Sequence, residues 1–591
     1  MGPGIILGVL IMLAARWIVD REPTDRFPNY TRGNAGEVLA DPVSPLGWTF
    51  GWESGFVLGC RDGFVQMGIF DADEYSADRP ETFGLFGGYF YNSLTQARLF
   101  GVRSGAGWQA VDNAYFDDPS AVPPYVERDW HESPRNTELL NKTMAWIMST
   151  PEVPEIERQK RDAKALRDSR PAVTVQTTEQ LLGRARSIQR HLTAMFAAHV
   201  WASLGASVGP GVLAALTADI DPSLVTRLLA GIGDVDSAAI ANRIWEMSRQ
   251  VRRSPALTAL FDGGVEGVST RLRASPAPDA VELCVAIDEF LLQHGSRGPN
   301  EWDIYSPSYE SKPELMFSAI DRLRASDDSA DPTVGEARGA AERERLSAEL
   351  ESRFAGDPAS LAMFRAGLHS ARVFMIARER CKTNNIRALH EIRWCFDELG
   401  RRLVGSGHLE HYRQIYMLTE DELDGYFAAP AAFRDMIIQR ERDYLELYEI
   451  EPPYIVDGEA PPLTTWKRKA DARVEPVEVG DVLKGVAGSP GVATGTAKVL
   501  MSVEDDIDLE PGDILVAPST DPAWTPLFLA ASAVVVNVGA VGTHAVIVSR
   551  ELGIPCVPSI ADATSRIPTG AVITVNGNEG TVTVVSLPIR V

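Results

Sequence analysis

The segment Gly539-Ala-Val-Gly-Thr-His-Ala-Val-Ile-Val-Ser-Arg-Glu-Leu-Gly-Ile-Pro555 decides the fold of the C-terminal part of this chain. The apolar run 533–538 predicts a buried strand, and the small residues after it allow close backbone approach. Helical spacing covers 545–552, and the glycine and proline that follow end the helix. The pattern predicts a strand, a glycine-rich turn and a short helix, with His544 at the helix N-terminus.

His544 is a candidate phosphoryl carrier. The free N–H groups and the positive end of the helix dipole favour a phosphoryl group and disfavour a protonated ring, so the imidazole stays neutral and nucleophilic. Thr543 is placed to hydrogen-bond the phosphate, and Arg550 is expected to reach back toward it. The alternative is a histidine that only caps or packs against the helix.

Composition limits the classes of partner. The 591 residues carry a net charge of -24, from 57 Lys and Arg against 81 Asp and Glu, which argues against nucleic acid or an anionic membrane. An apolar content of 45% is typical of a soluble globular protein with several domains. The five cysteines are scattered without a Cys-x-x-Cys pair, so they indicate neither a disulfide framework nor a metal site, and a cytoplasmic location is expected.

Residues 1–20 are predicted to be an apolar N-terminal extension. The run 5–19 contains Arg16 and is shorter than the roughly 20 residues that cross a bilayer. No basic residue precedes it as in a signal peptide. An extended start with initiation at Met12, a first core helix and a membrane anchor are the alternatives, in that order.

The rest of the chain divides by pattern into three parts. Residues 21–450 have mainly helical spacing, as in 387–404, where one apolar stripe faces a charged side. Residues 451–480 are spaced with prolines and cannot continue a helix, so they predict a linker. Residues 481–591 show short β-rich runs and a few helices, which predicts a compact α/β domain.

The linker leaves two alternatives open. A flexible segment of this length would span roughly 90 to 100 Å when extended, or about 30 Å as a coil. It would then let the C-terminal domain move between two sites. Alternatively, the segment packs along the helical part and moves little.

Two aromatic clusters, 48–56 and 83–91, have two interpretations. The first is ordinary core. The second is an apolar pocket for an aromatic or polycyclic acceptor, because ligand cavities are lined in this way.

Polar residues gather in two segments of the helical part. The loop 294–303 holds His294, Arg297, Glu301 and Asp303 on a Gly- and Pro-rich backbone, and 378–385 holds Arg378 and Lys382. The cations are candidates to bind the transferring phosphoryl group, and His294, Glu301 or Asp303 to accept a hydroxyl proton. An internal salt-bridge network is the alternative.

Residues 481–586 resemble the phosphohistidine swivelling domain of phosphoenolpyruvate-utilising enzymes, which include phosphoenolpyruvate synthase, pyruvate phosphate dikinase and the rifampicin phosphotransferases. Five motifs occur in the family's order: Gly-Val-Ala-Gly-Ser-Pro-Gly at 485–491, Gly-Asp-Ile-Leu-Val at 512–516, Thr-Asp-Pro-Ala-Trp-Thr-Pro at 520–526, the His544 motif, and Gly-Asn-Glu-Gly at 577–580. The chain departs from the family at Ala540, which replaces a second glycine, and at Gly542-Thr543, where the family has Thr-Ser or Met-Ser.

The helical part resembles the acceptor-binding region of rifampicin phosphotransferases, phosphoenolpyruvate-synthase-like proteins and the phosphohistidine subunit of phenylphosphate synthase. The resemblance rests on shorter motifs, at 31–37, 42–46, 295–301, 378–382 and 418–423.

The resemblance implies a phosphotransferase component of the dikinase type. We find neither an ATP-grasp domain nor a Gly-x-x-x-x-Gly-Lys-Ser/Thr loop in the sequence, so a separate ATP-grasp subunit is expected to charge His544. ATP and Mg²⁺ would bind at that partner, and ATP would yield AMP and phosphate. The acceptor is expected to be a small hydroxylated compound, such as a phenol, bound in the helical part. Two alternatives stay open: a non-catalytic binding or regulatory protein that retains the carrier fold, and direct transfer from phosphoenolpyruvate, which the missing barrel disfavours.

Overall fold

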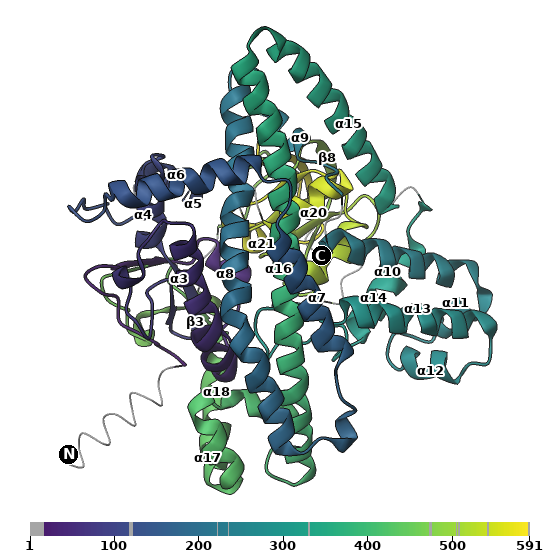
Figure 1. Cartoon of the computed structure of the whole chain (residues 1–591). Coiled ribbons are helices and arrows are strands. Elements are labelled where there is room, and N and C mark those ends of the chain that lie inside the picture. The colour runs from purple at the N-terminus through teal and green to yellow at the C-terminus, as the bar shows by residue number, and fades with distance from the viewer. Residues whose placement is uncertain are drawn as a thin grey trace, which may run out of the picture.

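The computed structural model describes residues 17–116, 122–221, 223–233, 236–328, 331–471, 475–503, 505, 509–539 and 543–588. Most of the expected extension 1–20 lies outside these residues. The described chain forms a helical body, a small sheet near its N-terminus and a C-terminal α/β domain (Figure 1). This is the predicted fold class.

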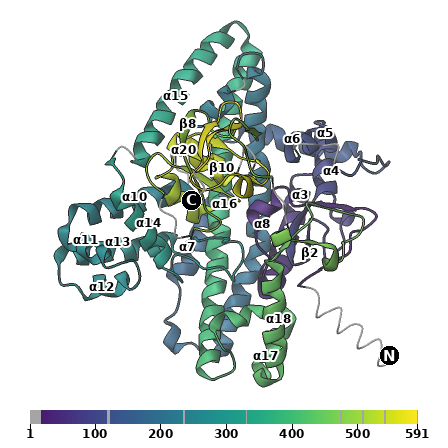
Figure 2. The same ribbon diagram turned by 180° about the vertical axis from the view of Figure 1, so that it is seen from behind.

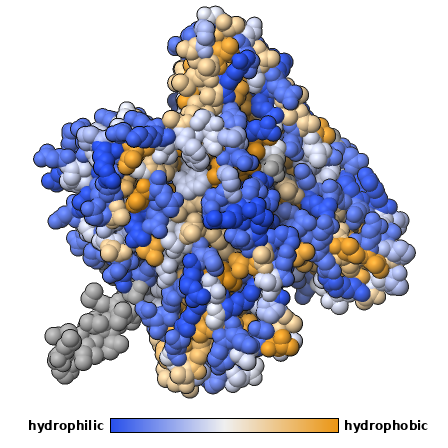
Figure 3. All heavy atoms as spheres, viewed as in Figure 1, coloured by the Kyte–Doolittle hydropathy of each residue, from blue (hydrophilic) through white to orange (hydrophobic). Residues whose placement is uncertain are grey.

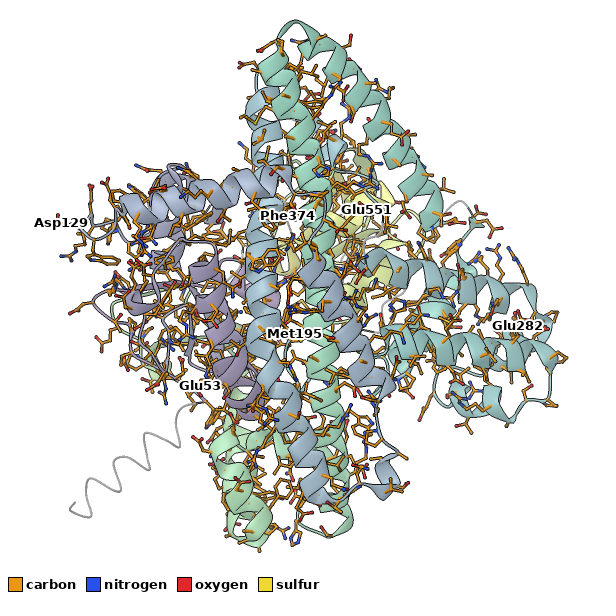
Figure 4. The ribbon with its side chains drawn as sticks, in the orientation of Figure 1. Glu53, Asp129, Met195, Glu282, Phe374 and Glu551 are labelled. Atoms are coloured by element: carbon orange, nitrogen blue, oxygen red, sulfur yellow. The ribbon has the colours of Figure 1, made fainter. Side chains whose placement is uncertain are left out.

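Two long helices form the centre of the body, and they pack along each other (Figure 1). They are α8 (Thr178–Thr217) and α16 (Pro358–Gly405). Small residues allow close contact, since a Cβ on Gly209 would lie 2.5 Å from the carbonyl oxygen of Gly367. Met195 of α8 and Phe374 of α16 lie within this pair (Figure 4). The predicted helix 387–404 is the C-terminal part of α16.

The N-terminal lobe packs beside α8 and contains a sheet that the sequence did not predict. The sheet has the order β2-β3-β1-β5, and the aromatic segment 83–91 supplies β2 and β3. Aromatic residues are common in strands as well as in helical cores. An aromatic cluster therefore did not by itself predict these strands. The elements of this lobe are β1 (Asn29–Thr31), α2 (Ala35–Val38), the π-helix η1 (Gly47–Phe56), α3 (Val57–Gln66), β2 (Phe83–Phe86), β3 (Tyr89–Ser93), α4 (Leu94–Ser104), α5 (Trp108–Tyr115) and α6 (Pro134–Ser149).

Shorter helices surround the central pair. One group, α10 to α14, packs around its own apolar cluster, and α15 forms an arm that leads into α16 (Figure 1). Their bounds are α7 (Pro154–Asp168), α9 (Leu224–Leu228), α10 (Asp236–Arg253), α11 (Pro255–Asp262), α12 (Val268–Ala274), α13 (Pro278–His294), α14 (Glu314–Ala325), α15 (Pro332–Arg353), α17 (Leu423–Ala428) and α18 (Arg434–Leu447).

The proline-spaced segment is anchored on the body as far as Asp471. Strand β5 (Ile455–Asp457) pairs antiparallel with β1, and β4 (Ile450–Glu451) pairs with β6 (Lys467–Arg468). The ring of Trp466 packs against Tyr89, with 6.2 Å between ring centroids. Residues 451–471 therefore pack along the helical body, which is the second of the two alternatives for the linker.

The C-terminal domain is built on a seven-stranded mixed sheet in the order β11-β10-β9-β8-β12-β13-β7. Strands β8 to β11 are parallel, and β8, β12, β13 and β7 pair antiparallel. The predicted strand and helix around His544 are β10 and α20. The bounds are β7 (Val482–Lys484), β8 (Val492–Val499), β9 (Ile514–Ala517), α19 (Thr525–Phe528), β10 (Ala533–Val536), α20 (His544–Leu552), β11 (Cys556–Val557), α21 (Ala563–Arg566), β12 (Val572–Asn576) and β13 (Thr581–Ser586).

The α/β domain is docked on the helical body, between α15 and the α10 to α14 group (Figure 2). Leu529 inserts into the apolar cluster of that group. The end of α20 approaches α15 so closely that a Cβ on Gly335 would lie 2.4 Å from the carbonyl oxygen of Leu552. The backbone N–H of Asn300 donates to the Oδ2 of Asp521 across the interface, at 2.8 Å. The structure thus holds His544 against the body.

The face shown in Figure 3 is mostly hydrophilic with scattered apolar patches. One 18-residue stretch of α8 is long and apolar enough to cross a membrane by composition, and 28% of it is buried. Such a helix is weak evidence for a span, and α8 packs against α3 and α16. The cytoplasmic location stays a prediction.

Candidate functional site

His544 is the first residue of α20, directly after the N-cap residue Thr543. Two threonine hydroxyls hold the half-buried ring: Thr520 Oγ1 lies 3.1 Å from Nδ1, and Thr525 Oγ1 lies 3.2 Å from Nε2. The ring of Phe528 meets the imidazole edge to face at 5.9 Å. A hydroxyl both donates and accepts, so this pair supports a neutral ring in either tautomer.

The electrostatics also favour the neutral imidazole. Burial lowers the pKa of His544 well below its ordinary value, and the cations Lys382 and Arg297 lower it further. The N-terminus of α20 acts in the same direction. An uncharged ring keeps a lone pair available for a phosphoryl group.

His544 lines a cavity of about 650 Å³ between the α/β domain and the body. The walls come from the N-terminal lobe, α8, the loop after α13, α16 and the 518–524 segment. Of the predicted site residues, the cavity brings together His544, Thr543, Glu301, Arg378 and Lys382.

A buried ion network lies at one side of this cavity. Arg297 donates two hydrogen bonds to Glu301, at 2.7 and 3.1 Å, and a third to Thr383 at 3.1 Å. Lys382 reaches the same carboxylate at 3.2 Å. Burial opposes ionisation of Glu301, but Arg297 and Lys382 outweigh it and lower its pKa. Two cations share one carboxylate, so this network has an excess positive charge that suits a phosphoryl group.

Two carboxyl groups that the sequence did not single out also line the cavity. Burial raises the pKa of Glu37 to about 8, against the opposing effect of Arg378 and Lys382. Burial raises the pKa of Asp521 to about 7, although it accepts hydrogen bonds from backbone N–H groups. Carboxyl groups with pKa values near neutral are suited to proton transfer.

The aromatic clusters divide between the core and the cavity. Trp48, Phe56 and Tyr91 are fully buried core residues. Cavity walls also include aromatic residues from distant parts of the chain, namely Trp52, Phe64, Phe83, Phe90, Phe100, Tyr115, Phe196 and Trp302. Part of the aromatic clusters thus lines a cavity, and an aromatic or polycyclic acceptor for it stays a prediction.

Four predicted site residues lie outside this cavity, and Arg297 is one of them, because it belongs to the ion network beside the cavity. Asp303 is fully buried and accepts hydrogen bonds from the N–H and hydroxyl of Ser44, at 2.7 and 2.6 Å, which fixes the start of η1. His294 ends α13 and faces a second cavity. Arg550 is buried near Cys556 and Glu551. Arg550 follows His544 by six residues, so helical geometry places its side chain on another face of α20, away from the cavity.

Arg378 and Lys382 both lie in the middle of α16, so the helix that the sequence predicts over 387–404 begins well before these two residues. The site also contains Thr520, Asp521 and Thr525, which the sequence analysis did not name as site residues. All three belong to the family motif 520–526, so this motif could have indicated them. Glu37 belongs to the motif 31–37 in the same way. His199 of α8, which also lines the cavity, had no sequence signal.

Comparison with known proteins agrees with this geometry. Residues 186–379 match the rifampicin phosphotransferase fourth domain, and residues 509–580 match the mobile domain of PEP-utilising enzymes. Part of the helical body is thus similar to a rifampicin phosphotransferase domain, and most of the α/β domain is similar to the mobile domain of PEP-utilising enzymes. The mobile-domain match includes His544 and its threonine contacts, and the fourth-domain match includes Glu301 and Arg378.

Three relatives cover different parts of the chain. An uncharacterised protein of Mycobacterium tuberculosis is 27% identical over 95% of this chain and 62% of its own length. The rifampicin phosphotransferase of Bacillus subtilis is 30% identical over 50% of this chain and 34% of its own length. The phosphoenolpyruvate synthase of Aeropyrum pernix is 44% identical over 144 residues, 23% of this chain and 18% of its own length. The chain thus spans less than two thirds of the relatives that it matches.

The described residues contain no group of three or more His, Cys, Asp or Glu side chains arranged to hold a metal ion. The His544 cavity is lined by charged groups of both signs, namely Glu37, Asp41, Glu301 and Asp521 together with Arg378, Lys382 and Lys469.

Proposed function

We propose that this chain carries a phosphoryl group on His544 and delivers it to a hydroxylated acceptor in the cavity between the α/β domain and the body. One observation carries the proposal: His544 lines the same cavity as Arg378, Lys382 and an aromatic wall. Phosphohistidine-type transfer also accords with the mobile-domain match and with the relatives named rifampicin phosphotransferase.

The transfer step balances without another reagent. The acceptor hydroxyl oxygen attacks phosphorus, the new O–P bond forms, and the P–N bond to His544 breaks, with its electron pair returning to the ring. Lys382 and Arg378 stabilise the charge on the phosphoryl oxygens. Glu37 accepts the hydroxyl proton, because its pKa of about 8 makes it a stronger base than an ordinary carboxylate. Glu301 is unsuited to this role because Arg297 and Lys382 occupy it.

The proposal includes a separate ATP-grasp subunit that binds ATP and Mg²⁺ and charges His544. To test it, the chain is incubated with a candidate nucleotide-binding partner, Mg²⁺ and ATP labelled with ³²P in both its β and γ groups. We expect acid-labile, base-stable label in the wild type and none in His544→Ala. Equal label in that variant would exclude His544 as the carrier.

A control keeps the result interpretable. His408→Ala changes a histidine outside the cavity, so it should retain the label. If no donor and partner label the wild type, while acceptor-like compounds still bind, the alternative of a non-catalytic binding protein replaces this proposal.

A further inference from the structure

A second cavity, of about 350 Å³, lies behind the ion network of the His544 site. It forms where α7, α10, α13 and α16 meet, helices that lie together in Figure 1. Its lining contains no described residue of the α/β domain. Arg297 and Thr383 line it, and both belong to the network that holds Glu301.

A buried hydroxyl faces this cavity. Ser296 is only 7% exposed and belongs to the lining. Within the described structure its Oγ has no hydrogen-bond partner. Leaving a buried polar group without a partner costs roughly 1–3 kcal/mol, so a ligand that supplies a partner to this hydroxyl is favoured in the cavity.

Unbalanced positive charge lies around the same space. Lys160 of α7 and Arg387 of α16 line the cavity, and neither has an ion-pair partner among the described residues. Arg387 donates one hydrogen bond, to the carbonyl oxygen of Gln293 at 3.2 Å. Most of its donors are therefore available to a ligand.

The lowered pKa values of two neighbouring groups, Arg387 and His294, agree with this excess of positive charge. Burial lowers the pKa of Arg387, and Arg297 and Arg380 lower it further against the opposing effect of Asp236. Burial, Arg297 and Arg387 together lower the pKa of His294 to about 3. Additional positive charge is thus disfavoured here, as expected near a site that takes an anion.

The nearby carboxylates are already occupied. Asp168 pairs with Lys164, and Glu391 pairs with Arg170 and Arg184. Asp236 lies 3.8 Å from Arg380. Asp236 also acts on Arg387 electrostatically, but neither Arg387 nor Lys160 forms an ion pair with these carboxylates.

Apolar side chains complete the lining. Leu291 and Leu292 of α13 and Ala239 of α10 also line the cavity. The volume exceeds that of a bare phosphate ion and allows a short apolar body.

We infer that this second cavity binds a small organic anion. Ser296, Arg387 and Lys160 hold one phosphate or carboxylate head group, and Leu291 and Ala239 contact the apolar body. Arg297 and Thr383 separate this ligand from His544, so the ligand is bound and not phosphorylated. The assignment does not depend on the proposed phosphotransfer.

Calorimetric titration of the full chain tests the assignment with three probes: propyl phosphate, butyrate and inorganic phosphate. We expect one organic probe to bind with one-to-one stoichiometry. Its affinity should fall at least tenfold in Arg387→Gln and about fivefold in Ser296→Ala, and Arg387→Lys should retain most of it. Propyl phosphate and butyrate distinguish a phosphate from a carboxylate head group.

Two matched controls locate the binding. Arg378→Gln alters the His544 cavity and Lys142→Gln an exposed cation elsewhere, and both should leave the affinity unchanged. Circular dichroism verifies that each variant is folded. The assignment is overturned if no probe binds the wild type at millimolar concentration, if all variants bind alike, or if Arg378→Gln alone loses binding. If inorganic phosphate binds and neither organic probe does, the claim that Leu291 and Ala239 contact an apolar body of the ligand is overturned.

Discussion

The ring of His544 is held by side chains of its own domain, because Thr520 and Thr525 contact its two nitrogens. A carrier histidine needs a fixed ring and one nitrogen free to react, and a hydroxyl partner satisfies both conditions because it releases the nitrogen easily. The cavity adds the charges: cations for the phosphoryl group and a weakly acidic carboxyl group for the proton.

Replacing one of these hydroxyls should slow the charging of His544. Thr525→Val keeps the shape of a fully buried side chain and removes a hydrogen bond of about 1 kcal/mol, which corresponds to a rate roughly fivefold lower. The rate of phosphohistidine formation from phosphoramidate, a small chemical donor, measures the effect without a partner. Thr494→Val, on the exposed face of the sheet, is the control. An unchanged rate in Thr525→Val would show that the hydroxyl has no positioning role.

Glu37→Gln should separate charging from delivery. The amide cannot accept the hydroxyl proton, so transfer from phosphorylated His544 to the acceptor should fall by roughly 10²-fold or more, while charging stays normal. In the wild type, the transfer rate should rise with pH up to about 8, because Glu37 must be ionised to act as a base. Single-turnover rates across pH 6 to 9 check both statements. A wild-type profile without this rise would exclude Glu37 as the base.

At the scale of elements, glycines set the distance between helices. A Cβ on Gly59 of α3 would lie 2.5 Å from the carbonyl oxygen of Thr193 in α8, and one on Gly63 would lie 2.9 Å from that of Ala197. These glycines let α3 lie directly on α8, and α8 supplies Phe196 and His199 to the cavity. The packing of the lobe and the shape of the site thus depend on the same contact.

Gly59→Ala should destabilise the body by roughly 1–3 kcal/mol, because the added methyl group forces the two helices apart. Gly183→Ala is a matched control within α8, since a Cβ there meets nothing within 4 Å. That substitution should stabilise the helix by about 0.8–1.0 kcal/mol. Urea unfolding followed by circular dichroism compares the two. Equal effects of the two substitutions would contradict the close contact of α3 and α8.

At the scale of the whole molecule, the anchored segment limits how the α/β domain moves. Asp471 follows strand β6 on the body, and Val477 is already buried in the core of the α/β domain. Six residue steps between them reach about 20 Å at most, far less than a free linker over 451–480. A large excursion therefore requires rotation about this short tether or release of β5 and β6.

The docking of the domain should depend on pH through Asp521. Its carboxyl group has a pKa of about 7 when docked, mainly because of burial, and is expected to return toward its ordinary value near 4 when the domains separate. Between these values only the docked form holds the proton, so docking weakens as pH rises from 4 to 7 and changes little above 7.

Small-angle X-ray scattering between pH 5 and 8.5 measures the docking equilibrium. The wild type should become more extended as pH rises, whereas Asp521→Asn, which cannot titrate, should show a much smaller response. A wild type that instead extends on acidification would contradict the assignment.

The sequence by itself determined most of the secondary structure. A buried apolar run, a glycine-rich turn and helical spacing placed His544 at the start of α20, because strand burial and helix capping depend on neighbours along the chain. The same local rules predicted the helical body and the C-terminal α/β domain. They failed for β2 and β3, whose pairing needs partners such as β1.

Only the tertiary structure decided which side chains meet. Glu301 and Asp303 are two residues apart on one loop, yet Glu301 reaches the cavity and Asp303 is bound by Ser44. Glu37 and Asp521 come from opposite ends of the chain and line one cavity. The direction of a loop side chain, and the burial that shifts its pKa, depend on packing between distant segments, which no local pattern contains.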